Sequence, residues 1–146
     1  MGKVRNILHS KGSTVFSMEP TVTVYKAIEL MSEKSISSLL VIDANGKLQG
    51  IFTNSDYSRK LILKGKSSKD TLLKDLMTEN PVGVTSESTI EDCMKIMTSK
   101  KIRHLPVIDG DKVCGMISMG DVVKFIIEEQ KGIIADLEQY ITNHHS

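Results

Sequence analysis

Tryptophan is absent from this 146-residue chain, and only 4% of its residues are aromatic, so its core must be built mainly from aliphatic side chains. Neither sign of charge dominates, because 19 Lys and Arg residues stand against 18 Asp and Glu residues. Nucleic acids and anionic membrane surfaces attract proteins with a one-sided basic field. We therefore expect neither as a partner.

Long apolar runs are also missing. The longest are only a few residues, far short of a membrane-spanning helix. Residues 1–6 are not followed by the apolar stretch of a signal peptide, and Asn6 stands where N-myristoylation needs Ser or Thr. These absences predict a cytoplasmic protein without a membrane partner.

Cysteine is scarce, with Cys93 and Cys114 at no metal or redox spacing. Cys93 falls within an apolar helical pattern and Cys114 on a short strand pattern, so both are interpreted as reduced thiols. His144 and His145 near the end are expected to form a frayed tail rather than a metal site. The sequence thus predicts no metal.

The chain contains an internal repeat. The stretch ISSLLVID at 36–43 returns as IRHLPVID at 102–109, and GIFTNSD at 50–56 returns as GMISMGD at 115–121. Similarity at a fixed period indicates two copies of one supersecondary unit. Because a unit of about 60 residues buries little surface by itself, we expect the copies to pack face to face as one domain.

Each copy has the pattern strand, helix, strand, strand, helix. Residues 15–16 and 82–84 are short extended segments, and turns at 43–47 and 109–112 predict antiparallel hairpins. The apolar runs 39–42 and 105–108 are typical of strands covered on both faces. Thr23 and Thr89 precede stretches with helical spacing. Those stretches carry Val24, Ala27, Ile28 and Met31 in the first copy and Ile90, Cys93, Met94 and Met97 in the second.

Two segments flank the copies. Val4, Ile7 and Leu8 predict a short docked helix, and apolar residues continue from Ile126 to Ile141. The latter stretch is either an amphipathic helix that meets a second subunit in a homodimer or a tail packed on its own domain. We expect an N-terminal helix and lead-in segment at 1–14, repeats at 15–76 and 77–130, and a C-terminal helix or tail at 131–146.

These motifs together resemble the CBS domain, named after cystathionine beta-synthase. The resemblance rests on MTENP at 77–81, the helix at 89–97, KIRHLPVID at 101–109 and GMISMGDVVK at 115–124, and it covers residues 10–130 as a tandem pair, or Bateman module. KGSTV at 11–15 and DYSRK at 56–60 look like stand-alone CBS-pair proteins of bacteria and of organelles of bacterial descent. The resemblance implies a mixed α/β (α+β) fold of two pseudo-symmetric β-α-β-β-α repeats.

The family resemblance also implies a function, namely a non-catalytic regulatory module with no required cofactor. Such modules bind AMP, ATP, NAD or S-adenosylmethionine between the repeats and signal to a second copy or to a regulated enzyme or transporter. On this sequence, the implied ligand-binding residues are Thr14, Val15, Ser37, Ser38, Thr53, Asp56, Arg59, Val84, Arg103, His104, Pro106, Ser118, Gly120 and Asp121. Backbone groups of 14–15 and 82–84 would hold the adenine, Ser37 and Ser38 would leave room for base or ribose, and Arg103 and His104 would contact phosphate.

The repeated pattern Gly-x-x-[Thr/Ser]-x-x-Asp permits two interpretations. Thr53 with Asp56, and Ser118 with Asp121, have the spacing of a capping box, in which the acid reaches back to the helix start. A carboxylate at such a turn can also bind the two hydroxyls of a ribose. Glu or Gln is preferred in capping boxes, so Asp in both copies favours the ribose role. Arg59 and Lys124 follow the acids as ligand contacts or as solvated charges.

One departure from the family pattern affects the expected ligand. Related proteins commonly carry Glu-Arg between the Thr and Asp of the first motif, where this chain has Asn54 and Ser55. The missing guanidinium favours a monophosphate or a dinucleotide over ATP. Two other functions stay open, a ligand-independent interaction subunit and a weak nucleotide hydrolase. An enzyme has little support, because no Ser or Cys has an evident neighbouring base and His104 is the lone candidate.

Overall fold

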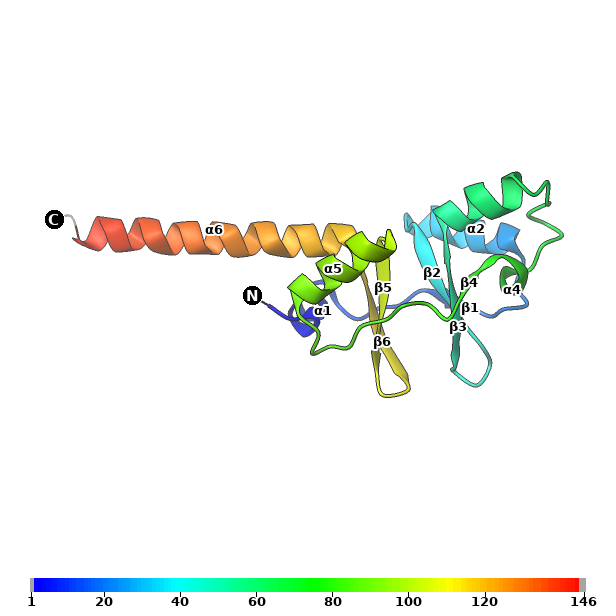
Figure 1. Cartoon of the computed structure of the whole chain (residues 1–146), viewed down its shortest axis with the longest axis horizontal. Coiled ribbons are helices and arrows are strands. Elements are labelled where there is room, and N and C mark those ends of the chain that lie inside the picture. Colours follow the sequence, from blue (N-terminus) through cyan, green and yellow to red (C-terminus); the bar gives the residue numbers. More distant parts are fainter. Residues whose placement is uncertain (1, 145–146) are drawn as a thin grey trace.

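The computed structural model describes residues 2–144, with the side chain of residue 144 and all of His145 outside that description. The chain forms two α/β halves and a long C-terminal helix that projects away from them (Figure 1). The elements of the first half and its flanks are α1 (Val4–Lys11), β1 (Ser17–Met18), α2 (Val24–Lys34), β2 (Ser38–Ile42), β3 (Leu48–Thr53), α3 (Asn54–Asp56), the π-helix η1 (Tyr57–Ile62), α4 (Leu73–Leu76) and β4 (Thr78–Glu79). Those of the second are α5 (Ile90–Lys100), β5 (His104–Asp109), β6 (Lys112–Ser118) and α6 (Met119–His144).

Both predicted hairpins are confirmed. β2 pairs antiparallel with β3, and β5 pairs antiparallel with β6, each with one irregularity at the equivalent place, between Val41 and Ile42 and between Val107 and Ile108. A parallel partner precedes each hairpin: β1 beside β2 in the first half, and a single bridge from Val84 to Val107 in the second. The first extended segment was expected at 15–16, but the strand begins at Ser17, two residues later.

The predicted helix starts are confirmed as well. The Thr23 hydroxyl accepts a hydrogen bond from the Lys26 N–H at 3.3 Å, and the Thr89 hydroxyl accepts one from the Asp92 N–H at 3.0 Å. These bonds satisfy N–H groups that the first turn of a helix otherwise leaves unpaired. Met94, expected on the apolar stripe of α5, is instead exposed.

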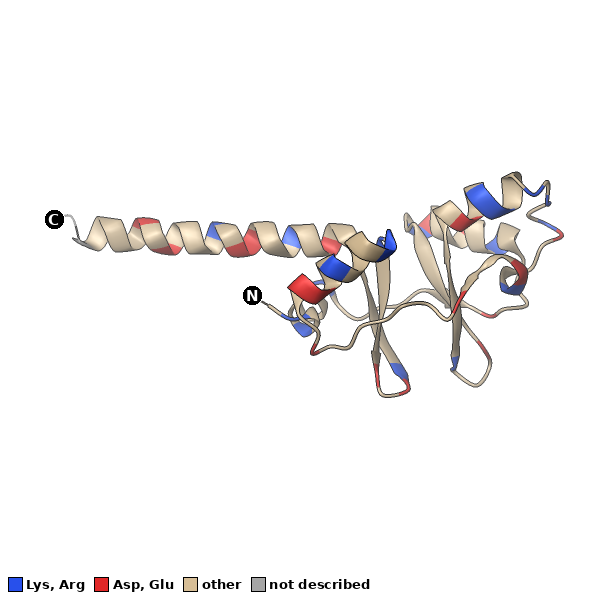
Figure 2. Ribbon diagram, in the orientation of Figure 1, with Lys and Arg blue, Asp and Glu red and all other residues tan. Residues whose placement is uncertain are grey.

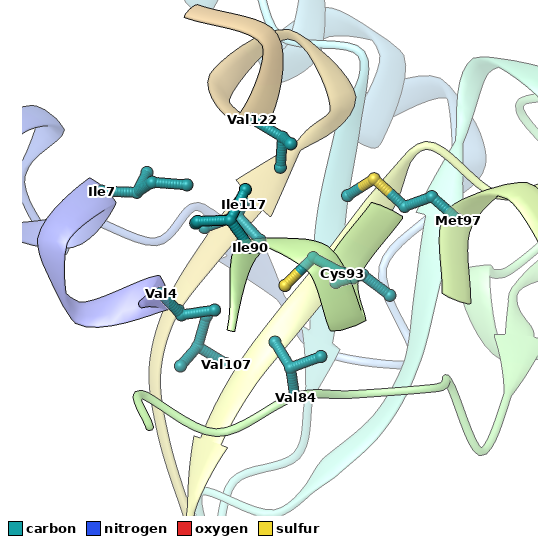
Figure 3. Packing of buried hydrophobic residues seen from close by; sticks show 10 residues of the cluster. Val4, Ile7, Val84, Ile90, Cys93, Met97, Val107, Ile117 and Val122 are labelled. Atoms are coloured by element: carbon teal, nitrogen blue, oxygen red, sulfur yellow. The ribbon is translucent and has the colours of Figure 1, made fainter. Parts of the chain in front are cut away.

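The halves exchange their leading helices. α1 precedes the first repeat in sequence, yet its Val4 and Ile7 are buried in the core of the second (Figure 3). α4 lies at the end of the segment expected as the first repeat, just before the second copy of the pattern, and its Leu73 and Leu76 lie in the core of the first half. Two backbone bridges hold the two helices in place, Lys3 to Thr89 and Thr23 to Leu72. Each core is therefore completed by the helix that precedes the other copy of the strand-helix-strand-strand-helix pattern.

The exchange accounts for a glycine that occurs in both copies. A Cβ built on Gly115 would lie 2.7 Å from the side chain of Leu8 in α1, and one built on Gly50 would lie 2.7 Å from the carbonyl oxygen of Thr78. Both distances are far below van der Waals contact. The repeated glycine thus makes room for a crossing segment, against fixed backbone at Gly50 and against the flexible end of a side chain at Gly115.

Helix α6 is one uninterrupted helix of 26 residues. Residues 130–143 are all exposed, so the interpretation of this segment as a tail packed on its own domain is wrong. Acidic and basic residues are interspersed over both halves and along α6 (Figure 2). No helix within residues 2–144 is long and apolar enough to cross a bilayer.

Both cysteines are free thiols, as predicted. Cys93 is fully buried, and this burial, together with the nearby carboxylate of Asp92, raises the pKa of its thiol to about 11. Over the part of the chain that the structure describes, His, Cys, Asp and Glu form no group that could hold a metal ion.

Candidate functional site: the cleft between the repeats

A cleft of about 620 Å³ lies where the two halves meet. That volume is in the range of small-molecule sites. Its lining comes from the first repeat, from the segment that connects the repeats, and from the second repeat. The lining residues are Ser37, Ile51, Thr53, Asn54, Ser55, Asp56, Arg59, Thr78, Asn80, Pro81, Val82, Lys101, Ile102, Arg103 and His104.

Asp56 supplies the carboxylate of the cleft, and its residue is only 7% exposed. Its Oδ2 accepts from the Thr53 N–H at 3.0 Å and from the Thr53 hydroxyl at 3.3 Å. Its Oδ1 accepts from the Thr78 hydroxyl at 3.1 Å and pairs with the Lys60 ammonium at 3.0 Å. A carboxylate accepts about four hydrogen bonds, so the chain itself occupies all of its capacity.

The capping box at Thr53 is closed in both directions, since the Asp56 N–H donates back to the Thr53 hydroxyl at 3.1 Å. Ser118 and Asp121 make the same two bonds, at 2.8 and 3.1 Å. Both acids reach the backbone N–H three residues before them, so the preference of capping boxes for Glu or Gln does not separate a ribose role from capping here. Capping is therefore one role of both residues.

The π-helix η1 begins directly after Asp56. Insertions of this kind are rare and recur at functional sites. Arg59 on its first turn lines the cleft and contacts the Ser55 hydroxyl at 3.4 Å. The side chain of Lys60, one residue on, is 35% exposed although it pairs with Asp56.

Asp121, the counterpart of Asp56, is engaged differently. Its Oδ2 forms a 2.7 Å ion pair with Lys11, which arrives at the end of the exchanged helix α1. Burial acts to raise the pKa of Asp121, but Lys11 and the Ser118 N–H outweigh it, so the pKa lies below its usual value. Asp121 is thus an anion neutralised by a lysine from the other end of the chain.

One hydrogen bond joins the repeats across the cleft. The Ser37 hydroxyl lies 3.0 Å from Nε2 of His104, with donor and acceptor set by the imidazole tautomer. Burial lowers the pKa of His104, Asp121 acts to raise it, and Arg103 and Lys11 lower it further. The net pKa is below the usual value, so the imidazole is neutral at pH 7, and we expect a weaker phosphate contact than a charged one would give.

The family model of the CBS domain matches residues 4–62 and again residues 73–128. The chain belongs to the CBS domain family. It is similar to the mitochondrial CBS domain-containing protein CBSX3 of Arabidopsis thaliana, with 39% identity over 123 residues, which cover 82% of this chain and 60% of the relative. The chain therefore spans less than two thirds of that relative's length.

Solved structures show the same tandem pair of CBS domains. A protein with CBS domains from Burkholderia ambifaria MC40-6 is 42% identical, with a TM-score of 0.85 over 88% of this chain and 96% of the other. The CBS domain pair of protein MJ0100 superposes with a TM-score of 0.78 over 88% of this chain and 98% of the other. The latter is only 21% identical, so it shows the fold alone.

The cleft of this CBS pair brings together part of the predicted set of ligand residues. Six of them line it: Ser37, Thr53, Asp56, Arg59, Arg103 and His104. Eight predicted residues are not in the lining: Thr14, Val15, Ser38, Val84, Pro106, Ser118, Gly120 and Asp121. Thr14 and Val15 lie between α1 and β1, and Ser118, Gly120 and Asp121 surround the start of α6.

The other three residues outside the lining belong to the packing of the sheets. Ser38 is buried opposite Thr53 in the first hairpin, and the carbonyl of the buried Pro106 accepts from the Val84 N–H at 3.0 Å. Val84 lines a separate hollow of about 520 Å³ beside α5. Within the segment expected to hold adenine, Val82 rather than Val84 faces the cleft between the CBS repeats.

Sequence reasoning missed Lys101 and the part of the connecting segment that comes before Val82. Lys101 ends α5 with a left-handed backbone (φ 56°), which turns the chain toward the cleft. Thr78, Asn80 and Pro81 belong to the MTENP motif that supported the family resemblance, so a signal was present without an assigned role. Asn80 also has a left-handed backbone (φ 48°), a conformation that Asn tolerates better than most residues.

Proposed function

We propose that this CBS pair is a regulatory module that binds an adenosine nucleotide in the cleft between its repeats. One observation carries the proposal: a single cavity is lined by the buried carboxylate of Asp56 and by three cationic side chains, Arg59, Lys101 and Arg103. A carboxylate suits a ribose diol, and cations suit phosphate. The apolar side chains of Ile51, Val82 and Ile102 in the same lining suit a base.

Ligand entry requires an exchange of partners at Asp56. A ribose hydroxyl would replace the Lys60 ammonium on Oδ1, whereas Thr53 is fixed by the capping box. Lys60 is partly exposed, and on turning to solvent it would also leave the Leu76 carbonyl and the Thr78 hydroxyl, to which it donates at 3.2 and 3.3 Å. The released Lys60 would then neutralise phosphate. With Asn54 and Ser55 in the motif, the proposed ligand is a monophosphate such as AMP or a dinucleotide such as NAD rather than ATP.

The solved structure of the MJ0100 pair is a complex with 5′-methylthioadenosine and S-adenosyl-L-methionine, a precedent for adenosine-containing ligands in this fold. For the present chain, binding would favour one relative arrangement of the repeats. The resulting coupling, about 1–3 kcal/mol in typical cases, would pass to a second copy in a homodimer or to a regulated enzyme or transporter.

Thermal melting of the full chain with AMP, NAD, ATP and S-adenosylmethionine tests the proposal. A ligand at about a hundred times its dissociation constant adds about 2.7 kcal/mol, and we expect AMP or NAD to raise the Tm. Asp56→Asn should abolish the shift, whereas Asp121→Asn, at the matching position outside the cleft, should retain it. The proposal fails if no nucleotide at millimolar concentration raises the Tm of the wild type.

The samples of the melting experiment also distinguish two alternative functions. A ligand-independent interaction subunit is favoured by the exposed apolar side chains of α6 and would show no nucleotide shift. A hydrolase is favoured by the Ser37–His104 contact, since a serine does lie beside a base, contrary to the expectation from the sequence. Within residues 2–144, however, no carboxylate is hydrogen-bonded to the other ring nitrogen of His104, which a triad requires. Product formed from ATP or NAD and lost in Ser37→Ala would favour the enzyme.

A further inference from the structure

The C-terminal part of α6, from residue 130 to residue 143, is exposed to solvent along its whole length. It leaves the body of the protein and extends well beyond it (Figure 1). Large apolar side chains are about half exposed along it, among them Ile133 at 49%, Ile134 at 53% and Leu137 at 56%. An isolated helix of this kind gains stability mainly by burying such a face against another element.

The apolar residues of α6 follow a heptad repeat. Ile127, Ile134 and Ile141 occupy position a, and Val123, Gln130 and Leu137 occupy position d. Ile126 and Ile133 at position g widen the stripe. The stripe from Val123 to Ile141 covers 19 residues and spans about 28 Å at about 1.5 Å per residue. A sustained repeat of this period is the sequence pattern of a coiled coil.

We propose that α6 pairs with α6 of a second copy as a parallel, in-register, two-stranded coiled coil. Within parallel coiled coils, isoleucine at a, with leucine at d as at Leu137, favours two strands. Gln130 is the single polar residue at the a and d positions, and an in-register parallel pair places it opposite its own copy, where two amides can hydrogen-bond. A lone polar core residue is a known device for fixing register.

The charged residues of α6 lie outside the core positions. Lys124, Lys131 and Glu138 occupy position e, beside the stripe, whereas Glu129 and Asp136 occupy position c, on the side of the helix away from a partner. The orientation of the pair is therefore set by the core positions, above all by Gln130.

This inference rests on the proposed homodimer and not on nucleotide binding. Sedimentation velocity of the full chain tests whether the apolar stripe of α6 mediates dimerisation. We expect a dimer for the wild type, a monomer for Ile134→Lys with Leu137→Lys, and a dimer for Gln139→Lys, which adds the same charge on the opposite face. A wild-type monomer, an assembly larger than a dimer, or a double variant that stays dimeric would overturn the coiled coil. A double variant that stays dimeric would still be consistent with a homodimer formed through another surface. Nucleotide-induced melting shifts are measured separately and test the nucleotide proposal whatever the oligomeric state.

Cysteine cross-linking tests orientation and register. Gln130→Cys and Leu137→Cys are made separately in a Cys114→Ser background, in which the remaining Cys93 is fully buried. Under mild oxidation, a parallel in-register pair cross-links at both positions. An antiparallel pair brings at most one of these positions opposite itself, so a cross-link at only one, or at neither, would overturn the proposal.

Discussion

The Ser37 hydroxyl and Nε2 of His104 form a hydrogen bond of 3.0 Å between positions that are not equivalent in the two CBS repeats. By the alignment of the repeats, Ser37 corresponds to Arg103, and His104 corresponds to Ser38. The bond therefore breaks the pseudo-symmetry of the pair at the cleft. It shows that the two copies have diverged, so that they contribute different and complementary residues to the two sides of the cleft.

The lowered pKa of His104 predicts a pH-dependent stability. The unfolded chain takes up this proton near pH 6.5 and the folded chain only at lower pH, so the unfolded state binds more protons in between. The stabilisation is thus present above about pH 6.5 and is lost as the pH falls through the folded-state pKa. Urea unfolding from pH 7.5 to 5 should show this loss in the wild type and less of it in His104→Gln. A variant of the exposed His9 is the control, and a His104 NMR titration midpoint at or above 6.5 would contradict the prediction.

The Lys11–Asp121 ion pair predicts a second pH effect. Because the pKa of Asp121 is lowered, its contribution is present above about pH 3.9 and is lost as the pH falls through the folded-state pKa. Both side chains are partly exposed, so we expect Lys11→Met to cost about 1 kcal/mol or less at pH 7. The difference from wild type should shrink at pH 3. Lys124→Met, at an exposed position of α6, is the control. If the difference in unfolding free energy between Lys11→Met and wild type does not change with pH, Lys11 acts only through packing.

Arg59 is predicted to contribute to phosphate binding but not to nucleoside binding. A charge-assisted hydrogen bond contributes about 1.5–3 kcal/mol, so Arg59→Ala should weaken AMP binding roughly ten- to a hundredfold and leave adenosine nearly unchanged. Calorimetric titration with both ligands measures the ratio. Lys124→Ala is the matched control, since Lys124 holds the same place in the second repeat and is not in the lining of the cleft. Equal losses for AMP and adenosine would show that Arg59 shapes the cleft instead.

The repeated glycines are predicted to differ in their tolerance of a methyl group. Gly50→Ala meets the backbone carbonyl of Thr78, which cannot move without breaking the β3–β4 pairing. Gly115→Ala meets the end of the flexible Leu8 side chain. We expect Gly50→Ala to cost about 1–3 kcal/mol, as in overpacked cores, and Gly115→Ala to cost less. Chemical denaturation compares them; a larger loss at Gly115 would mean that α1 cannot adjust.

The sequence by itself determined the main helices and both hairpins, because their causes are local, but not the π-helix η1 or the short strand β4. Apolar spacing and the threonine caps predicted α2 and α5, and turn residues predicted both hairpins. Duplication together with ordered motifs predicted the tandem CBS pair.

The tertiary structure decided what depends on contacts between distant residues. It exchanged α1 and α4 between the halves, brought Lys11 to Asp121, and placed Lys101 and Thr78 at the cleft. It also showed that α6 projects away from the two α/β halves. Residues far apart in the chain carry no mutual signal in a single sequence, since their pairing arises only when one half closes on the other.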